Sequence, residues 1–85
     1  MNLVFKPNAF EDLTYWIKTD RKKTVQILKL IDAILRDPFK GPGKPEALRF
    51  NFAGCWSRRI DRTHRLVYKV EEDTLVVLSC RYHYE

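Results

Sequence analysis

The sequence predicts a single α+β domain over residues 1–85, with two N-terminal helices packed on one face of a mainly antiparallel sheet in the order βααββββ. Three observations lead to this prediction. Apolar residues recur at helical spacing in the first 37 residues, and a loop with two glycines and two prolines follows at residues 41–45. The segments after that loop have the composition and alternation of short strands.

The helical half has recognisable ends. A short strand is expected at residues 2–6, and Pro7 suits the first turn of a helix, where its missing N–H costs nothing. The apolar stripe of that helix is Phe10, Leu13, Trp16 and Ile17. Thr19 and Asp20 supply a capping oxygen for a second helix, which Asp37 before Pro38 should end. The stripe of the second helix is Thr24, Ile27, Leu28, Ile31, Ile34 and Leu35.

Four strands are expected in the second half, at residues 47–52, 55–61, 64–70 and 74–84. Residues i and i+2 of a strand share a face. On that basis Arg65 and Arg81 should project together on the open side of the sheet, with His83 near its edge. In residues 55–61 the alternation separates Ser57 and Arg59 from the intervening side chains, but it leaves open which set faces outward.

Positive charge is concentrated on the predicted strands. The chain carries +5, whereas residues 36–69 alone hold nine basic and three acidic residues, a net charge of +6. The aromatic residues among these strands and at the C-terminus are Phe50, Trp56, Tyr82 and Tyr84. Arginine binds phosphate and aromatic rings stack on bases, so the pattern predicts an RNA-facing surface. The alternative is a solvated basic sheet that only keeps the chain in solution.

Two residues stand out as candidates for proton transfer. Glu46 lies in a basic segment and could act as a base or as an ion-pair partner for Arg49 or Arg65. His83 could be a proton carrier or an exposed surface group, and His64 is expected to be structural.

Several other classes of site are not indicated. No metal-ligand spacing, glycine-rich phosphate loop or Ser-His-Asp signature is present, so neither a metal nor a cofactor is expected. Cys55 and Cys80 lie 25 positions apart, as expected of reduced thiols in a cytoplasmic protein. No apolar run approaches the ~20 residues of a membrane span, and no signal peptide is expected.

Four segments of the chain have a distinctive sequence: GPGKPEAL at residues 41–48, GCWSRRI at 54–60, HRLVY at 64–68 and CRYHY at 80–84. These segments resemble motifs of the YoeB toxin family, within the RelE-like toxin superfamily, and their order and spacing agree across nearly the whole chain. The resemblance implies a RelE-like microbial ribonuclease fold and the toxin of a type II toxin–antitoxin system.

The resemblance also implies an activity and partners. The toxin would be a metal-independent endoribonuclease that cleaves mRNA in the A site of the ribosomal 30S subunit and so blocks translation. Its partners would be the ribosome, mRNA, a YefM-like antitoxin and a second copy in a homodimer. Glu46 would be the general base, His83 the general acid and Arg65 the group that stabilises charge on the phosphate, while Tyr84 would place the scissile nucleotide. The RNA-binding residues would be Lys44, Arg49, Arg58, Arg59 and Arg81.

The chain departs from the family pattern at two places. Where some relatives carry Lys and then His, this chain has Arg49 and Phe50, and Phe50 can stack but cannot transfer a proton. Glu85 extends the chain one residue beyond the usual terminal tyrosine. Two non-enzymatic alternatives remain: an RNA- or ribosome-binding module that blocks translation by occupancy, and a protein-interaction domain with a basic patch.

Overall fold

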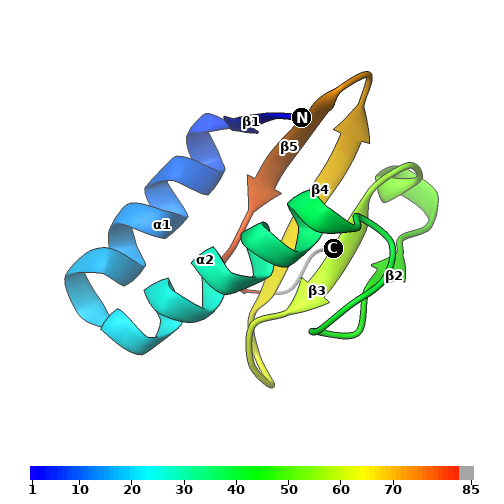
Figure 1. Cartoon of the computed structure of the whole chain (residues 1–85). Coiled ribbons are helices and arrows are strands. Elements are labelled where there is room, and N and C mark those ends of the chain that lie inside the picture. The colour runs from blue at the N-terminus through cyan, green and yellow to red at the C-terminus, as the bar shows by residue number, and fades with distance from the viewer. Residues whose placement is uncertain (83–85) are drawn as a thin grey trace.

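The structure is a computed structural model that describes residues 1–82 of the chain. Two helices lie side by side over one face of a five-stranded sheet (Figure 1). The elements are β1 (Asn2–Phe5), α1 (Pro7–Thr19), α2 (Arg21–Arg36), β2 (Glu46–Ala47), the 3₁₀ turn η1 (Phe50–Phe52), β3 (Trp56–Arg59), β4 (Arg65–Glu71) and β5 (Thr74–Ser79). The predicted α+β class and the βααββββ order are confirmed.

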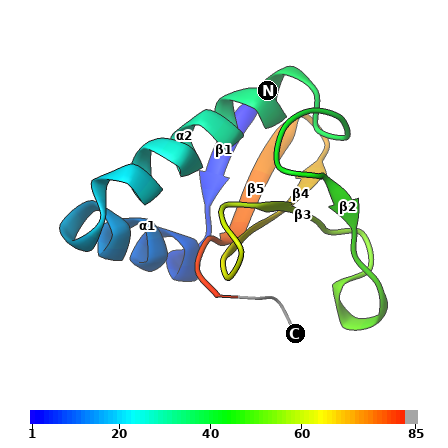
Figure 2. The same cartoon turned by 90° about the horizontal axis from the view of Figure 1, so that it is seen from below.

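The strand order across the sheet is β1-β5-β4-β3-β2. β1 pairs in parallel with β5, and the other three neighbouring pairs are antiparallel, as expected for a mainly antiparallel sheet. The two helices connect β1 at one edge to β2 at the other, so they cross the sheet and cover one face (Figures 1 and 2). The opposite face is not covered by a helix of residues 1–82.

The helix ends follow the residues that the sequence marked. Asp20 alone separates the helices, and its side chain accepts a hydrogen bond of 3.2 Å from the amide of Lys23. Asp37 caps the end of α2, and its carboxylate accepts from the amides of Phe39 and Lys40. These local side-chain bonds satisfy backbone groups that the helix leaves unpaired.

The core lies between the helices and the sheet. Its fully or nearly buried members are Ala9, Trp16, Ile27, Leu30, Ile31, Ile34, Ile60, Leu66, Tyr68, Leu75, Val77 and Cys80. Two residues of the expected stripe in α1, Phe10 and Ile17, are instead about 60% exposed, because the helix faces the sheet through Ala9, Leu13 and Trp16. None of the helices in residues 1–82 is long and apolar enough to cross a membrane.

Two expected strands are shorter than predicted. The segment at residues 47–52 pairs with β3 only at its start and then turns into η1. The last strand stops at Ser79, because tertiary hydrogen bonds redirect the chain at Cys80. The amide of Cys80 donates to Asp12 Oδ2 at 3.0 Å, and its carbonyl accepts from Trp16 Nε1 at 2.9 Å. Both partners lie on α1, more than 60 residues away in the sequence.

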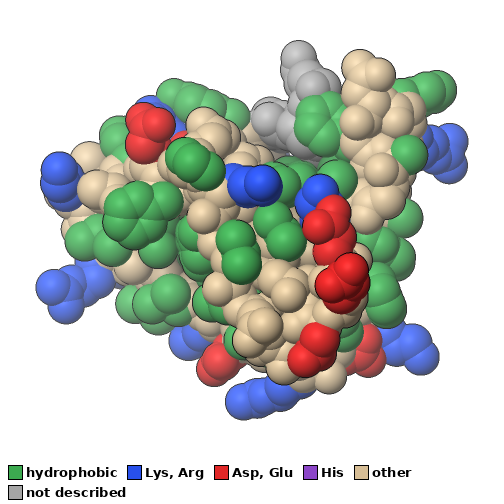
Figure 3. Space-filling model, turned by 90° about the horizontal axis from the view of Figure 1, so that it is seen from above, with side chains coloured by type: hydrophobic (Ala, Val, Ile, Leu, Met, Phe, Trp, Pro, Cys, Tyr) green, Lys and Arg blue, Asp and Glu red, His purple; other side chains and the backbone are tan. Residues whose placement is uncertain are grey.

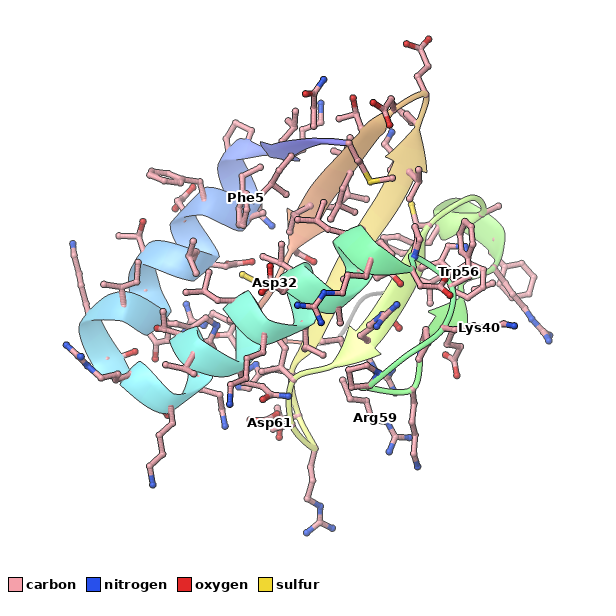
Figure 4. The ribbon with its side chains drawn as sticks, in the orientation of Figure 1. Phe5, Asp32, Lys40, Trp56, Arg59 and Asp61 are labelled. Carbon is pink, nitrogen blue, oxygen red and sulfur yellow. The ribbon has the colours of Figure 1, made fainter. Side chains whose placement is uncertain are left out.

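Asp61, just after β3, ties the sheet to α2 (Figure 4). Its Oδ1 accepts from the amides of Thr63 and His64, at 2.8 and 2.6 Å, and its Oδ2 lies 2.6 Å from Nζ of Lys23. Burial raises the pKa of the Asp61 carboxyl, but the Lys23 ammonium and the two amides outweigh burial and bring that pKa down to about 2.

The depressed pKa of Asp61 makes a pH-dependent contribution to stability. A carboxylate with a folded pKa near 2 stabilises the fold in full above its unfolded pKa of about 4, and this stabilisation is lost as the pH falls from about 4 to about 2. We expect Asp61→Asn to lower the free energy of unfolding by about 1–2 kcal/mol at pH 7, with the difference vanishing near pH 2. Urea unfolding at a series of pH values measures this.

The matched control is Asp32→Asn, because Asp32 is an exposed carboxylate on α2 (Figure 4). It should change the free energy of unfolding little at any pH. A deficit in Asp61→Asn that stayed constant from pH 7 to pH 2 would show that the charge of Asp61 is not what stabilises the fold.

Candidate active site

The strand register shows which side chains of the sheet face away from the helices. Leu66 and Tyr68 of β4 lie in the core under the helices, so the alternate residues of β4 face the open side. The register pairs Glu46 of β2 with Ser57 of β3, Ser57 with Val67 of β4, and Val67 with Ser79 of β5. These paired residues form a row across the open face, and Glu46 stands at its outer end.

Arg65 reaches into this row from β4. Its Nη1 donates a hydrogen bond of 3.3 Å to the Oγ of Ser57, which is fully buried. Ser57 therefore has Glu46 as its cross-strand neighbour on one side and the Arg65 guanidinium on the other. Neighbouring strands are about 4.8 Å apart, so the backbones of β2 and β4 are separated by about 10 Å with Ser57 between them.

Two arginines are paired directly across β3 and β4. Arg59 lies opposite Arg65 in the register and is exposed, and as the second residue after Ser57 on β3 it shares the face of Ser57. Arginine forms bidentate hydrogen bonds to phosphate oxygens, so these two guanidiniums are candidates for holding a phosphate group.

The C-terminal segment is held against the start of β4. The amide of Arg65 donates to the carbonyl of Tyr82 at 3.0 Å, and the amide of Tyr82 donates to Nδ1 of His64 at 2.7 Å. The His64 ring also contacts the edge of Trp16, with centroids 4.8 Å apart. The structural role expected for His64 is therefore confirmed. The predicted site residues His83 and Tyr84 lie outside the described residues.

Arg58 was expected to bind RNA, and this expectation is wrong. Its side chain is fully buried on the helix side of β3. The guanidinium donates four hydrogen bonds to protein groups: to Tyr68 Oη at 3.1 Å, the Pro42 carbonyl at 3.2 Å, the Asp37 carbonyl at 2.7 Å and the Lys40 carbonyl at 3.1 Å. A guanidinium occupied in this way does not reach an external phosphate.

The partners of Arg58 all belong to the connection between α2 and β2, apart from Tyr68, which itself donates to the Pro38 carbonyl at 2.7 Å. The loop wraps the arginine closely. A Cβ on Gly41 would stand 2.9 Å from Arg58 Nη1, and both Gly41 and Gly43 adopt positive φ. The Gly43 carbonyl also accepts from the amide of Arg59 at 2.7 Å. Arg58 thus fixes the loop that leads, three residues later, into Glu46.

The remaining basic candidates divide by location. Lys44 and Arg49 are exposed on either side of β2, and residues 46–50 line a hollow of about 410 Å³. Arg81, expected beside Arg65 on the open face, instead stacks on Tyr15 of α1, with its Cζ 3.5 Å from the ring centroid. The expectation of a shared Arg65–Arg81 face is therefore wrong, because the strand alternation stops at Ser79.

The charged groups are segregated. Figure 3 shows acidic side chains gathered on the face that carries the turn between β4 and β5, where Glu71, Glu72 and Asp73 are exposed. The exposed cations Lys40 and Arg59 lie at the opposite end, near β2 and β3 (Figure 4). A polyanion of any kind would therefore be favoured near Lys40 and Arg59 and disfavoured at the hairpin turn.

Other nucleophiles and ligand clusters do not compete with this site. Burial raises the pKa of the Cys80 thiol to about 12, with a further contribution from Asp12, so this residue is not a thiolate nucleophile at neutral pH. Within residues 1–82 no three or more histidine, cysteine or acidic side chains gather closely enough to hold a metal ion.

Comparison with known proteins decides the family. Residues 5–84 match the model of the YoeB-like toxin of bacterial type II toxin–antitoxin systems. This chain belongs to the YoeB toxin family.

Individual YoeB relatives are similar over the full length. The Toxin YoeB of Streptomyces coelicolor is 54% identical over 99% of this chain and 100% of its own. A solved YoeB/ParE toxin from Agrobacterium tumefaciens is 43% identical with a TM-score of 0.96, covering 99% of this chain and all of the other. YoeB of Staphylococcus aureus has been solved as a dimer and in a heterotetrameric complex with YefM. Both structures are 44% identical to this chain, with TM-scores of 0.91 and 0.90, and each match covers 99% of this chain and 98% of the other. The expected RelE-like fold is confirmed.

The structure of this YoeB family member adds one residue that sequence reasoning missed. Ser57 had no signature around it, yet it lies between Glu46 and Arg65. The alternation that grouped Ser57 with Arg59 was the available signal, because both face the open side with Arg65. Trp56, by contrast, was counted among the RNA-facing aromatics but packs against Phe39 and the core on the helix side.

The neighbouring residues Arg58 and Arg59 offer a matched test of the loop anchor. Arg58→Lys keeps the charge but has too few donors in the required plane, so some of the carbonyls of Asp37, Lys40 and Pro42 lose their partner. We expect this change to lower the free energy of unfolding by about 3 kcal/mol, and Arg59→Lys, at an exposed position, by less than about 0.5 kcal/mol. Urea unfolding measures both. Equal small losses would contradict the anchoring role of Arg58.

Proposed function

We propose that this toxin is a ribosome-dependent endoribonuclease that cleaves mRNA by attack of the ribose 2′-OH on the adjacent phosphate. The observation that supports it best is the arrangement around Ser57, which has Glu46 of β2 as its cross-strand neighbour and accepts a hydrogen bond from the Arg65 guanidinium of β4. The opposed Arg59 and Arg65 supply a place for the phosphate next to that carboxylate.

Each group has a role that its chemistry allows. Glu46 takes the proton from the 2′-OH, whose oxygen forms a bond to phosphorus as the bond to the 5′ oxygen breaks. Arg65 stabilises the added charge on the pentacoordinate phosphate, and Ser57 holds the guanidinium in place through its Oγ. His83, which follows Tyr82 in the chain, returns a proton to the departing 5′ oxygen, and Tyr84 places the nucleotide. The nucleophile comes from the RNA, so the reaction requires no metal ion.

Arg58 serves this reaction as a positioning residue. It contacts neither the open face nor the RNA, but it holds the 37–43 loop by its carbonyl oxygens. β2 is only two residues long, so its own pairing with β3 provides few hydrogen bonds to fix Glu46. The loop anchor supplies the rigidity that this short strand lacks.

The partners follow from the family and from the charge distribution. The basic end of the sheet suits the A site of the 30S subunit with its mRNA, since the phosphate backbone dominates such binding. A YefM-like antitoxin and a second copy of the chain are further partners, as in the S. aureus YoeB structures. Antitoxin and ribosome both place the toxin in the cytoplasm.

The catalytic assignment predicts a loss of chemistry with retention of binding. Glu46→Gln and His83→Gln should each lower the single-turnover cleavage rate of ribosome-bound mRNA by about 10²–10⁴-fold, as is usual for a general base or acid. Arg65→Lys keeps the charge but loses the fork and should lower the rate by about 10²-fold. Primer extension locates new 5′ ends and measures the rate.

Matched controls and a substrate change complete the test. Glu11→Gln and Arg21→Lys make the same substitutions at exposed positions on the helices and should cleave at the wild-type rate. A 2′-deoxy nucleotide on the 5′ side of the scissile phosphate should abolish cleavage. Inhibition of translation without new 5′ ends would instead mean that the toxin blocks the ribosome by occupancy, and cleavage of the deoxy-substituted mRNA would refute 2′-OH attack.

A further inference from the structure

Phe50 is the most exposed large apolar side chain of the described chain. It is 92% exposed, although it directly follows the segment that carries Glu46. Its backbone has φ = 56°, in the left-handed region that bulky residues rarely adopt. The fold therefore accepts a strained backbone and an unburied ring at one position, and it gains no packing in return. Such a combination is typical of a residue kept for a ligand.

The turn that carries Phe50 is rigid. The amide of Leu48 donates to the Cys55 carbonyl at 2.9 Å, the amide of Phe52 to the Arg49 carbonyl at 3.1 Å, and the amide of Ala53 to the Phe50 carbonyl at 3.0 Å. Leu48 is itself buried. The first bond ties the chain ahead of η1 to the residue before β3, and the other two close the turn itself, so the ring stands on a hydrogen-bonded base and loses little backbone freedom when a ligand contacts it.

The position of Phe50 points to RNA as the ligand. Phe50 and Glu46 line the same hollow of about 410 Å³, with Arg49 between them in the chain. Figure 2 shows that η1 projects from the sheet on the side away from the helices, which is the side of the Glu46–Ser57 row. An exposed ring flanked by arginine, within one hollow of the proposed base, has the two features that hold a single-stranded base: a stacking surface and a cation for the backbone.

We propose that Phe50 is a stacking platform for an unpaired RNA base next to the scissile phosphate. This inference rests on the proposed function and adds a subsite to it. Every base has a π face, so the platform holds the nucleotide in place with little preference among bases. Discrimination among codons then arises elsewhere in the site.

A binding cycle tests the platform. The probe is ribosome-bound mRNA blocked against cleavage by 2′-O-methyl groups, with each nucleotide of the vacant codon in turn either intact or abasic. Phe50→Ala should raise the Kd for intact mRNA about tenfold, whereas Phe50→Tyr, which keeps the ring, should bind as the wild type does. With the abasic nucleotide at the stacked position, Phe50→Ala should change the Kd less than twofold, because the base that it loses is already absent.

Controls separate this inference from the alternatives. Phe10→Ala removes an exposed phenylalanine from α1 and should leave the Kd unchanged. An equal effect of Phe50→Ala on intact and abasic mRNA at all positions would overturn the platform, as would a variant that loses dimerisation or antitoxin binding while it binds mRNA normally. Cleavage of unmodified mRNA distinguishes the two proposals. If the wild-type toxin cleaves but Phe50→Ala leaves the Kd unchanged, the stacking platform is wrong and the nuclease proposal stands. If Phe50→Ala raises the Kd but the wild-type toxin does not cleave, the nuclease proposal is wrong.

Discussion

A single buried guanidinium organises the half of the molecule that carries the site. Arg58 lies in the interior with no carboxylate partner among residues 1–82, and its guanidinium donates instead to backbone carbonyls at and after the end of α2. The C-terminus of a helix carries partial negative charge, which favours a cation there. Arginine meets this need better than lysine because its planar fork reaches several carbonyls at once. Removing it would leave the buried Tyr68 hydroxyl and three partly buried carbonyls without this donor, which is costly.

The position of Glu46 depends on the hydrogen bonds of Arg58 through the loop between α2 and β2. The loop fixed by Arg58 joins β3 through the Gly43–Arg59 hydrogen bond and then enters β2, where Glu46 stands opposite Ser57. Arg58, on the core side of β3, therefore helps to fix the position of Glu46 beside the open side of the same strand. Adjacent residues of one strand have opposite tasks, since Arg58 anchors the loop and Arg59 faces Arg65 across the sheet. Arg59 is exposed and Arg65 half-buried, and both belong to the surface that is proposed to hold phosphate.

The features that the sequence predicted correctly are those determined by residues close together in the chain. Asp20 as a cap, Asp37 before Pro38 as a stop and the glycine–proline loop correctly mark the ends of the helices and the change from helices to strands. The errors involve contacts between distant residues. No local pattern indicates that Arg58 meets carbonyls 16 to 21 positions earlier in the chain.

The same limit applies at the end of the sheet and within the site. The final strand was overextended because the bonds from α1 that divert Cys80 span more than 60 residues. The sequence prediction placed Arg58, Arg59 and Arg81 on one RNA-binding surface. In the structure Arg58 lies in the core, Arg59 on the open face, and Arg81 against Tyr15 of α1. Glu46 and Arg65 were brought together by family resemblance alone; the register pairs Glu46 with Ser57, and the Arg65 guanidinium donates to Ser57 Oγ.

A double-mutant cycle on cleavage tests most directly whether the buried arginine acts through the carboxylate. The single-turnover rate at saturating toxin is compared for Arg58→Lys in the wild-type and Glu46→Gln backgrounds, at a temperature where all four proteins are folded. We expect Arg58→Lys to slow cleavage about tenfold when Glu46 is present and less than twofold when it is replaced, because residues that act as a unit are not additive. The same fold-loss in both backgrounds would contradict this account and leave Arg58 with a purely structural role.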